Sequence, residues 1–172
     1  MKIKNIIITF VSAIALLLST SVVSFAKVVG DKIVLGAAVS LTGKYSSNGV
    51  HTQNGYNMAV DRINSMGGIK VGGKTYKFEI IYYDDESNPK RAAQLAERLI
   101  SQDGVEFMLG PYSSGLTKAM APVTEKYGVP MVEANGASRS LFTKGYKYLF
   151  AVLAPANLYL DCLLYTSPSP RD

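Results

Sequence analysis

Residues 107–117 read Phe-Met-Leu-Gly-Pro-Tyr-Ser-Ser-Gly-Leu-Thr. The apolar run that ends at Gly110 and the apolar-periodic segment that follows are typical of a buried strand that turns into a helix. Free N–H groups at the start of a helix, together with the positive end of its dipole, favour a carboxylate or a phosphate. The hydroxyls of Ser113 and Ser114 can add donors, and Gly115 lets a ligand approach the backbone. Taken alone, the stretch predicts either an anion site or an ordinary helix cap, since serine is favoured at any helix start.

Strands and helices alternate on both sides of this stretch. Continuous apolar runs predict buried strands, and apolar residues at helical spacing predict helices, one of them capped by Asn88-Pro89. This alternation predicts an α/β fold, an open, mostly parallel sheet with helices on both faces. The predicted strands are 33–39, 76–83, 107–109, 130–133 and 148–153, and the predicted helices are 50–66, 89–102 and 116–127.

Each predicted helix carries an apolar stripe that should face the sheet. Pro122 within the last helix implies a kink or a later start. Gly72-Gly73 predicts a tight turn ahead of the second strand. The stripes are Tyr56, Ala59, Val60 and Ile63 in the first helix, Ala92, Leu95, Ala96, Leu99 and Ile100 in the second, and Leu116, Ala119, Met120, Val123 and Tyr127 in the third.

Small polar residues follow three of the predicted strands. The loops 40–49, 110–115 and 134–138 are rich in Ser, Asn, Thr and Gly. Because open parallel sheets bind ligands beyond the carboxyl ends of their strands, these loops should share one edge. Tyr45 and Tyr112 lie in them and can wall a pocket for an apolar part of a ligand. Three such loops on one edge predict a ligand site better than any one of them does.

The motifs of several enzyme classes are missing from the sequence. No Gly-x-Gly-x-x-Gly follows the first strand, and neither a phosphate loop nor a Gly-x-Ser-x-Gly nucleophile elbow is present. Asp84 and Asp85, at the end of the second strand, are interpreted as turn and helix-start acids. His51, the only histidine, is interpreted as a solvated residue, so no metal site is expected. We therefore expect a protein that is not an enzyme and that has no cofactor.

Residues 1–26 are typical of a secretory signal peptide. Two lysines precede an apolar run at 6–23, and Ser24-Phe25-Ala26 places small residues where a signal peptidase requires them. We predict cleavage after Ala26; an uncleaved membrane anchor is the alternative. No cysteine lies at the cleavage site, which argues against a lipid anchor. The mature chain is expected in the periplasm.

The C-terminal residues 162–172 break from the rest of the sequence. They read Cys-Leu-Leu-Tyr-Thr-Ser-Pro-Ser-Pro-Arg-Asp, resemble the translation of a sequencing adapter and are interpreted as non-native. A genuine Ser/Pro tail is the alternative. The domain is then 27–161, with 15 basic residues, 12 acidic residues and no cysteine. A net charge of about +3 without a basic cluster argues against nucleic acid, and stability must come from an apolar core.

Five motifs carry a family resemblance. They are Gly-Ala-Ala-Val-Ser-Leu-Thr-Gly at 36–43, Ile-Asn at 63–64 with Gly-Gly-Ile at 67–69, Asp-Asp at 84–85 with Asn-Pro at 88–89, Gly-Pro-Tyr-Ser-Ser at 110–114 and Tyr-Gly-Val-Pro at 127–130. In this order they resemble the branched-chain amino acid and amide binding proteins, which are type I periplasmic substrate-binding proteins of ABC importers. The resemblance covers nearly all of 27–161 and implies the N-terminal lobe of a two-lobed receptor that closes about a hinge.

The resemblance also implies which residues meet the ligand. Ser114, and then Ser113, match residues that hold a ligand carboxylate. Ala137 and Ser138 match a loop that contributes a carbonyl and a hydroxyl near the ammonium and carboxylate, with the register open by one residue. The segment 45–48 matches the part that covers the ligand side chain. The implied ligand-binding residues are Tyr112, Ser113, Ser114, Gly115, Ala137, Ser138, Tyr45, Ser47 and Asn48.

The implied function is that of the substrate-binding component of an ABC importer, which binds an amino acid, branched-chain or similar, or an amide between two lobes. The expected partners are that ligand and a membrane permease, and a monomer is expected. The acidic residue that pairs with the ammonium in the family would lie after residue 161, so weak or undetectable binding is expected from this chain. A ligand-sensing ectodomain of the same fold and a secreted α/β enzyme whose catalytic residues lie elsewhere are the alternatives.

Overall fold

The sheet is organised around β2, the apolar strand near the start of the domain. In the computed structural model, which describes residues 28–159, β2 pairs in parallel with β4 along its whole length and with β5 on its other edge. The parallel array continues through β6 and β7, and the full order is β3-β4-β2-β5-β6-β7, with β3 and β1 antiparallel to their partners. The strands are β1 (Val28–Val29), β2 (Lys32–Val39), β3 (Ile69–Val71), β4 (Lys74–Asp84), β5 (Met108–Leu109), β6 (Met131–Glu133) and β7 (Leu149–Ala151).

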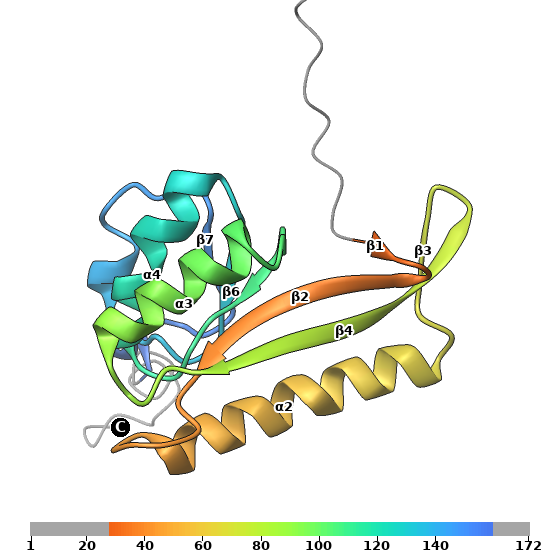
Figure 1. The fold of residues 1–172 in the computed structure, drawn as a ribbon. Helices are drawn as coiled ribbons and strands as arrows, with labels where there is room; N and C mark the ends of the chain where they lie inside the picture. The colour runs from red at the N-terminus through yellow and green to blue at the C-terminus, as the bar shows by residue number, and fades with distance from the viewer. Residues whose placement is uncertain (1–27, 160–172) are drawn as a thin grey trace, which may run out of the picture.

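Helices lie on both faces of this sheet, as predicted (Figure 1). One long helix, α2, runs along one face beneath β2 and β4, and α3 and α4 pack together on the other face. The predicted signal peptide 1–26 and the tail 162–172 lie outside the described residues. The helices are α2 (Ser46–Ser65), α3 (Pro89–Ser101) and α4 (Ser114–Tyr127), with short 3-10 helices η1 (Arg139–Leu141) and η2 (Ala156–Leu158).

The start of α3 confirms the predicted cap. The Asn88 side chain accepts hydrogen bonds from the N–H groups of Lys90 and Arg91, and Pro89 occupies the first helical position, where its missing N–H costs nothing. The predicted stripe of α3 is also confirmed, with Ile100 half-buried and the other four members buried. This stripe packs on β2 and α4 and forms the centre of the apolar core.

The start of α2 differs from the prediction. The helix begins at Ser46, four residues before Val50, because Gly49 donates to the Tyr45 carbonyl at 2.8 Å and closes the first turn. Its first turn is polar, so apolar periodicity does not mark it. The predicted stripe is only partly correct, since Ala59 is exposed. The buried positions of α2 are Gly49 and Thr52, which are small enough to let the helix lie close to the rim loops.

The helix α4 runs from Ser114 through Pro122 without interruption, so the predicted later start is wrong. Its buried face is also turned relative to the predicted stripe, since Thr117 and Thr124 are buried while Tyr127 is 38% exposed. Both threonine hydroxyls donate to backbone carbonyls one turn earlier, at 2.9 and 3.1 Å, and this lowers the cost of burying them. Tyr127 instead donates its hydroxyl to Glu97 on α3 at 2.8 Å.

A tight hairpin joins β3 and β4. Gly72 and Gly73 have φ angles of 57° and 81°, which suit the two-residue turn predicted there. The short edge strand β3 itself was not predicted.

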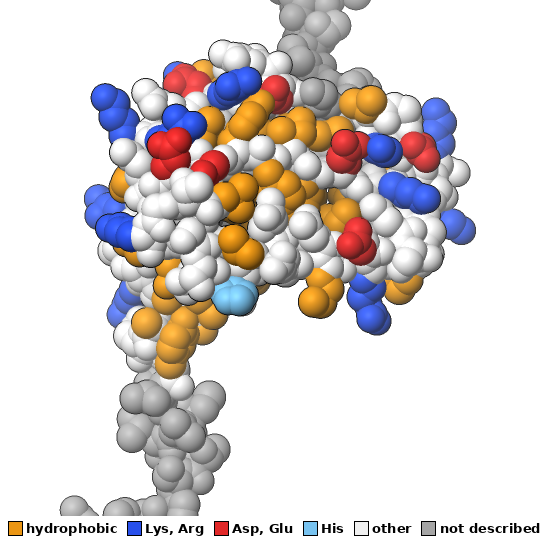
Figure 2. Space-filling model, turned by 60° about the horizontal axis from the view of Figure 1, so that its bottom comes forward, with side chains coloured by type: hydrophobic (Ala, Val, Ile, Leu, Met, Phe, Trp, Pro, Cys, Tyr) orange, Lys and Arg blue, Asp and Glu red, His pale blue; other side chains and the backbone are white. Residues whose placement is uncertain are grey.

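Part of the sheet face that carries α2 has no helix over it among the described residues. Met108 in β5 and Met131 in β6 are buried in the core together with residues of α3 and α4. Their chain neighbours Phe107, just before β5, and Val132, in β6, therefore point to the opposite face. These two side chains are 41% and 39% exposed. Hydrophobic side chains gather across the middle of the face shown in Figure 2. The resulting groove of about 480 Å³ is lined by Ile33, Leu35, Ile69, Val71, Phe78, Phe107, Met108, Leu109, Pro130 and Val132.

Candidate functional site

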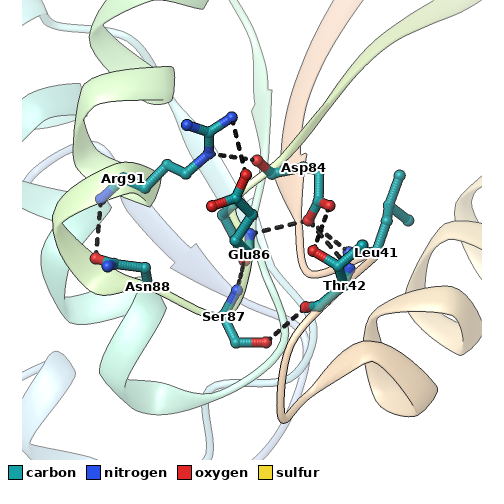
Figure 3. A network of polar contacts seen from close by, with 8 residues as sticks. Leu41, Thr42, Asp84, Glu86, Ser87, Asn88 and Arg91 are labelled. Atoms are coloured by element: carbon teal, nitrogen blue, oxygen red, sulfur yellow. Dashed lines mark hydrogen bonds and ion pairs between the residues drawn. The ribbon is translucent and has the colours of Figure 1, made fainter.

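The loops after β2 and β4 are tied together by Asp84 (Figure 3). Its carboxylate accepts from the N–H groups of Leu41 and Thr42 at 2.9 and 3.2 Å, from the Thr42 hydroxyl at 2.7 Å and from the Glu86 N–H at 2.9 Å. Burial alone would raise the pKa of this carboxyl, but the hydrogen bonds prevail and lower it below its ordinary value. Asp84 therefore acts as a turn acid, as predicted, and in addition fixes the rim loop that leads into α2.

Asp85 adds a second tie beside the first. It is buried, and its Oδ1 accepts from the Ser40 hydroxyl at 2.6 Å and from the Ser87 N–H at 2.8 Å. Burial raises the pKa of this carboxyl, opposed by the hydrogen bonds from Ser40 and Ser87. Both acids at the end of β4 thus bind protein groups, which leaves the ligand to other residues of the rim.

The two serines at the start of α4 have different partners. Ser113 is the N-cap, with φ at 81°, and its hydroxyl accepts from the Leu116 N–H at 3.4 Å. The Ser114 hydroxyl instead accepts from the Ser138 N–H at 3.0 Å. This bond joins the loop after β5 to the loop after β6, so two of the predicted site loops meet directly. The sequence predicted either a helix cap or an anion site here. Ser113 is the helix cap, whereas Ser114 contacts the neighbouring loop.

A pocket of about 400 Å³ lies between α2 and these loops. Two predicted residues, Asn48 and Tyr112, line it, and Tyr45 packs edge-on against Tyr112 with ring centres 5.5 Å apart. Ser47 is exposed in the first turn of α2. The lining consists of Asn48, His51, Thr52, Gly55, Tyr56, Tyr112, Ala134 and Asn135.

Sequence reasoning missed the contribution of α2 to this pocket. Tyr56 was interpreted as part of the core stripe, whereas it lines the pocket; His51 is exposed, as predicted, and also lies in the pocket lining. The signal in the sequence was the recurrence of Asn48, Thr52 and Tyr56 every four residues, which places them on one face of a helix. The Tyr56 hydroxyl donates to the Gly110 carbonyl at 2.7 Å, and burial raises its pKa, so it stays neutral.

Of the loop after β6, Ala134 and Asn135 line the pocket, whereas the predicted residues Ala137 and Ser138 lie outside its lining. The Ala137 carbonyl accepts from the Ala156 N–H at 2.8 Å, and the hydroxyls of Ser138 and Ser140 lie 2.9 Å apart. Asn135 lines the pocket and donates its amide to the Thr52 hydroxyl at 3.3 Å. The pocket is therefore bounded by amides, hydroxyls, one imidazole and tyrosine rings. Within residues 28–159 no group of three or more His, Cys, Asp or Glu side chains could hold a metal ion, and no helix could cross a membrane.

The family model for periplasmic binding proteins matches residues 32–158. This chain belongs to the periplasmic binding protein family. The match includes all three helices and every loop of the rim, so the pocket described above is a feature of a periplasmic binding protein lobe.

Relatives of this periplasmic binding protein include amino-acid receptors. The Leu/Ile/Val-binding protein BraC3 of Rhizobium johnstonii is 30% identical over 145 residues, which is 84% of this chain and 36% of the relative. The solved structure of LivJ, a branched-chain amino acid transporter substrate-binding protein of Streptococcus pneumoniae in complex with isoleucine, has a TM-score of 0.65 and 33% identity, over 72% of this chain and 34% of its own. A solute-binding protein of an ABC transporter from R. palustris, solved with 4-hydroxybenzoate, has a TM-score of 0.58 and 31% identity, over 70% of this chain and 31% of its own.

This periplasmic binding protein spans about a third of the length of the relatives it matches. The matched part corresponds to one lobe, and the relatives are solute-binding proteins by name.

Proposed function

We propose that this chain supplies one lobe of the substrate-binding component of an ABC importer, exported to the periplasm, and that it binds an amino acid, branched-chain or similar, or an amide. The observation that carries the proposal is the hydrogen bond from the Ser138 N–H to the Ser114 hydroxyl, which joins the loops after β5 and β6; Tyr112 and Asn135 of the same two loops line the pocket. The names of the relatives supply the ligand class. The same relatives support a non-enzymatic role, and the proposed partner is a membrane permease.

The start of α4 is the proposed seat of the ligand carboxylate. The first bond within the helix is donated by the Thr117 N–H to the Ser113 carbonyl at 3.1 Å, so the N–H groups of Ser114 and Gly115 precede it. The Ser114 hydroxyl uses its oxygen as an acceptor toward Ser138 and keeps its proton for a ligand. Because these donors coincide with the positive end of the α4 dipole, an anionic group is favoured there.

The tyrosines and α2 form the proposed seat for the rest of the ligand. Tyr112 and Tyr45 present ring surface, and Asn48 and Thr52 present polar groups on the opposite side of the pocket. A ligand with an aliphatic side chain and a free carboxylate fits this arrangement: the side chain packs on the tyrosine rings and the carboxylate binds at the start of α4. An aromatic acid such as 4-hydroxybenzoate, the ligand of one structural neighbour, shares the carboxylate and is the competing ligand class.

Titration of this chain with isoleucine, valine, a small amide and 4-hydroxybenzoate, followed by the backbone amide signals in NMR, tests the proposal. We expect millimolar affinity for isoleucine, since the described residues supply one side of the site, with shifts at Ser114, Tyr112 and Asn135. Ser114→Ala should weaken binding about tenfold because one charge-assisted hydrogen bond is lost. Ser113→Ala is the matched control: it should cost about 1 kcal/mol of stability through the lost cap and leave the affinity unchanged.

Two results would contradict the proposal. Isoleucine shifts confined to residues away from the pocket would exclude this site, and stronger binding of 4-hydroxybenzoate than of every amino acid would exclude the ligand class. Sub-micromolar affinity of this chain would instead contradict the expectation of weak binding by one lobe.

A further inference from the structure

Glu133, at the end of β6, is a charged residue that the proposed ligand contacts do not use. Its side chain is fully buried and does not line the pocket. The Oε2 atom accepts from the N–H of Asn135 at 3.1 Å and also from the N–H of Gly136. The Oε1 atom is buried and has no hydrogen-bond partner among the described residues. The carboxylate therefore binds only the backbone of the loop that follows it.

Two successive N–H groups that converge on one point form a backbone site for an anion. In this loop the Glu133 carboxylate occupies that site from within the protein. The fit leaves no spare room, since a Cβ added at Gly136 would lie 2.6 Å from the Glu133 Oε2 and 2.8 Å from a Leu141 methyl. A ligand anion consequently cannot use these N–H groups.

The loop is fixed at two further points, the first of which joins two residues that line the pocket. The Asn135 amide donates to Thr52 on α2 at 3.3 Å, and the Ser138 N–H donates to Ser114 on α4 at 3.0 Å. Glu133 thus binds the backbone of the loop at Asn135 and Gly136, while Asn135 and Ser138 connect the same loop to α2, which lines the pocket, and to the start of α4.

We propose that Glu133 is a positioning residue: its carboxylate fills the anion-binding turn of the loop 134–138 and so directs the carboxylate of a ligand to the start of α4 instead. The claim that Glu133 directs a ligand carboxylate rests on the proposed function. The claim that Glu133 fixes the loop 134–138 does not. The charge on Glu133 also disfavours a second ligand anion at this end of the pocket, which suits a ligand whose other end is neutral or cationic. Burial raises the pKa of the Glu133 carboxyl, and the hydrogen bonds from Gly136 and Asn135 oppose this.

Chemical rescue tests the proposal. In Glu133→Ala the N–H groups of Asn135 and Gly136 lose their acceptor, and the missing side-chain atoms leave a space for acetate. We expect the amide signals of 135–138 to move from their wild-type positions and to return, saturably, on addition of acetate. In the wild type, acetate should not affect the amides of Asn135 and Gly136. The ratio of the affinity for isoleucine to that for 3-methylpentanoate, the same molecule without the amino group, should fall about tenfold in the variant, since the negative charge that attracts the ammonium of isoleucine is lost.

Glu125 supplies a matched control. Its carboxylate also accepts hydrogen bonds from two successive backbone N–H groups, those of Lys147 and Tyr148 at 2.9 and 3.0 Å, but Glu125 is only half-buried and does not line the pocket. Glu125→Ala should leave the 135–138 signals and the affinity ratio unchanged. If Glu133→Ala fails to fold, Glu133→Gln keeps an acceptor oxygen without the charge, and amide hydrogen exchange at Asn135 and Gly136 should then be about tenfold faster than in the wild type.

The outcomes separate the two proposals. Rescue by acetate together with the change in affinity ratio supports both. Rescue in a chain that binds no amino acid supports the hold on the loop and contradicts the proposed function. An unchanged loop in Glu133→Ala, or unchanged exchange in Glu133→Gln, overturns the positioning role.

Discussion

A single carboxylate at the end of β4 connects two loops of the rim, the loop after β2 and the loop after β4. Asp84 accepts four hydrogen bonds, from Leu41, Thr42 and Glu86. Sequence reasoning anticipated an acid that stabilises a turn here, because Asp before a helix start is common. It could not anticipate Leu41 and Thr42 as partners, since they are more than forty residues away and only the parallel pairing of β2 with β4 brings them near.

The depressed pKa of Asp84 predicts an acid-dependent loss of stability. Its folded-state pKa lies below its ordinary value, so its contribution is complete above the unfolded-state pKa and is lost as the pH falls through the folded-state pKa. Asp84→Asn should lower the free energy of unfolding by about 1–2 kcal/mol at pH 7, allowing for partial solvent exposure, and the difference from the wild type should close below about pH 4. Urea unfolding at several pH values measures this.

Asp61, an exposed acid on α2, provides the control. Asp61→Asn should change the free energy of unfolding by less than about 0.5 kcal/mol at every pH. If the free energy of unfolding of Asp84→Asn stayed equally far below that of the wild type at pH 3, the charge on Asp84 would not be what stabilises the two loops.

Among the helices, the start and the buried face of α3 could be predicted from the sequence, whereas those of α2 were predicted only in part. The Asn88-Pro89 start and a continuous apolar stripe define α3 locally. In α2 the first turn is polar and the buried positions are Gly49 and Thr52, so periodicity pointed to the wrong start and left Thr52 unassigned. The reason is that α2 approaches the rim through small residues and hydrogen bonds rather than through a broad apolar face.

The two glycines of α2 allow this close approach to be tested. A Cβ at Gly49 would collide with the Ser40 backbone, whereas nothing lies within 4 Å of a Cβ at Gly55. Gly49→Ala should therefore destabilise the protein by about 1–3 kcal/mol. Gly55→Ala, in the middle of the helix, should stabilise it by about 0.5–1 kcal/mol. Thermal or urea unfolding measures both, and equal effects of the two substitutions would contradict the packing described here.

At the scale of the whole molecule, the sheet is covered unequally. Parallel sheets are generally buried on both faces, yet the groove beside α2 leaves Phe107 and Val132 partly exposed. Figure 2 shows this apolar surface with charged groups toward its edges. Solvent-exposed apolar surface of this kind binds hydrophobic dyes and lowers solubility.

We expect this chain to bind a dye such as anilinonaphthalene sulfonate in its folded state, and Val132→Lys to reduce that fluorescence while raising solubility. Met58→Lys, on the outer side of α2 where Met58 is 72% exposed, is the control and should leave the fluorescence unchanged. Little dye binding by the folded wild type would contradict an uncovered face.

The sequence by itself determined the order of the five parallel strands and the three helices between them, the cap of α3 and the three polar loops of the rim, because these depend on local periodicity and on residues adjacent in the chain. Only the tertiary structure decided that Ser113 caps while Ser114 contacts Ser138, that α2 lines the pocket and that Glu133 holds the loop after β6. Those contacts join segments far apart in the sequence, and their geometry is fixed by strand register and helix packing, which no local pattern encodes.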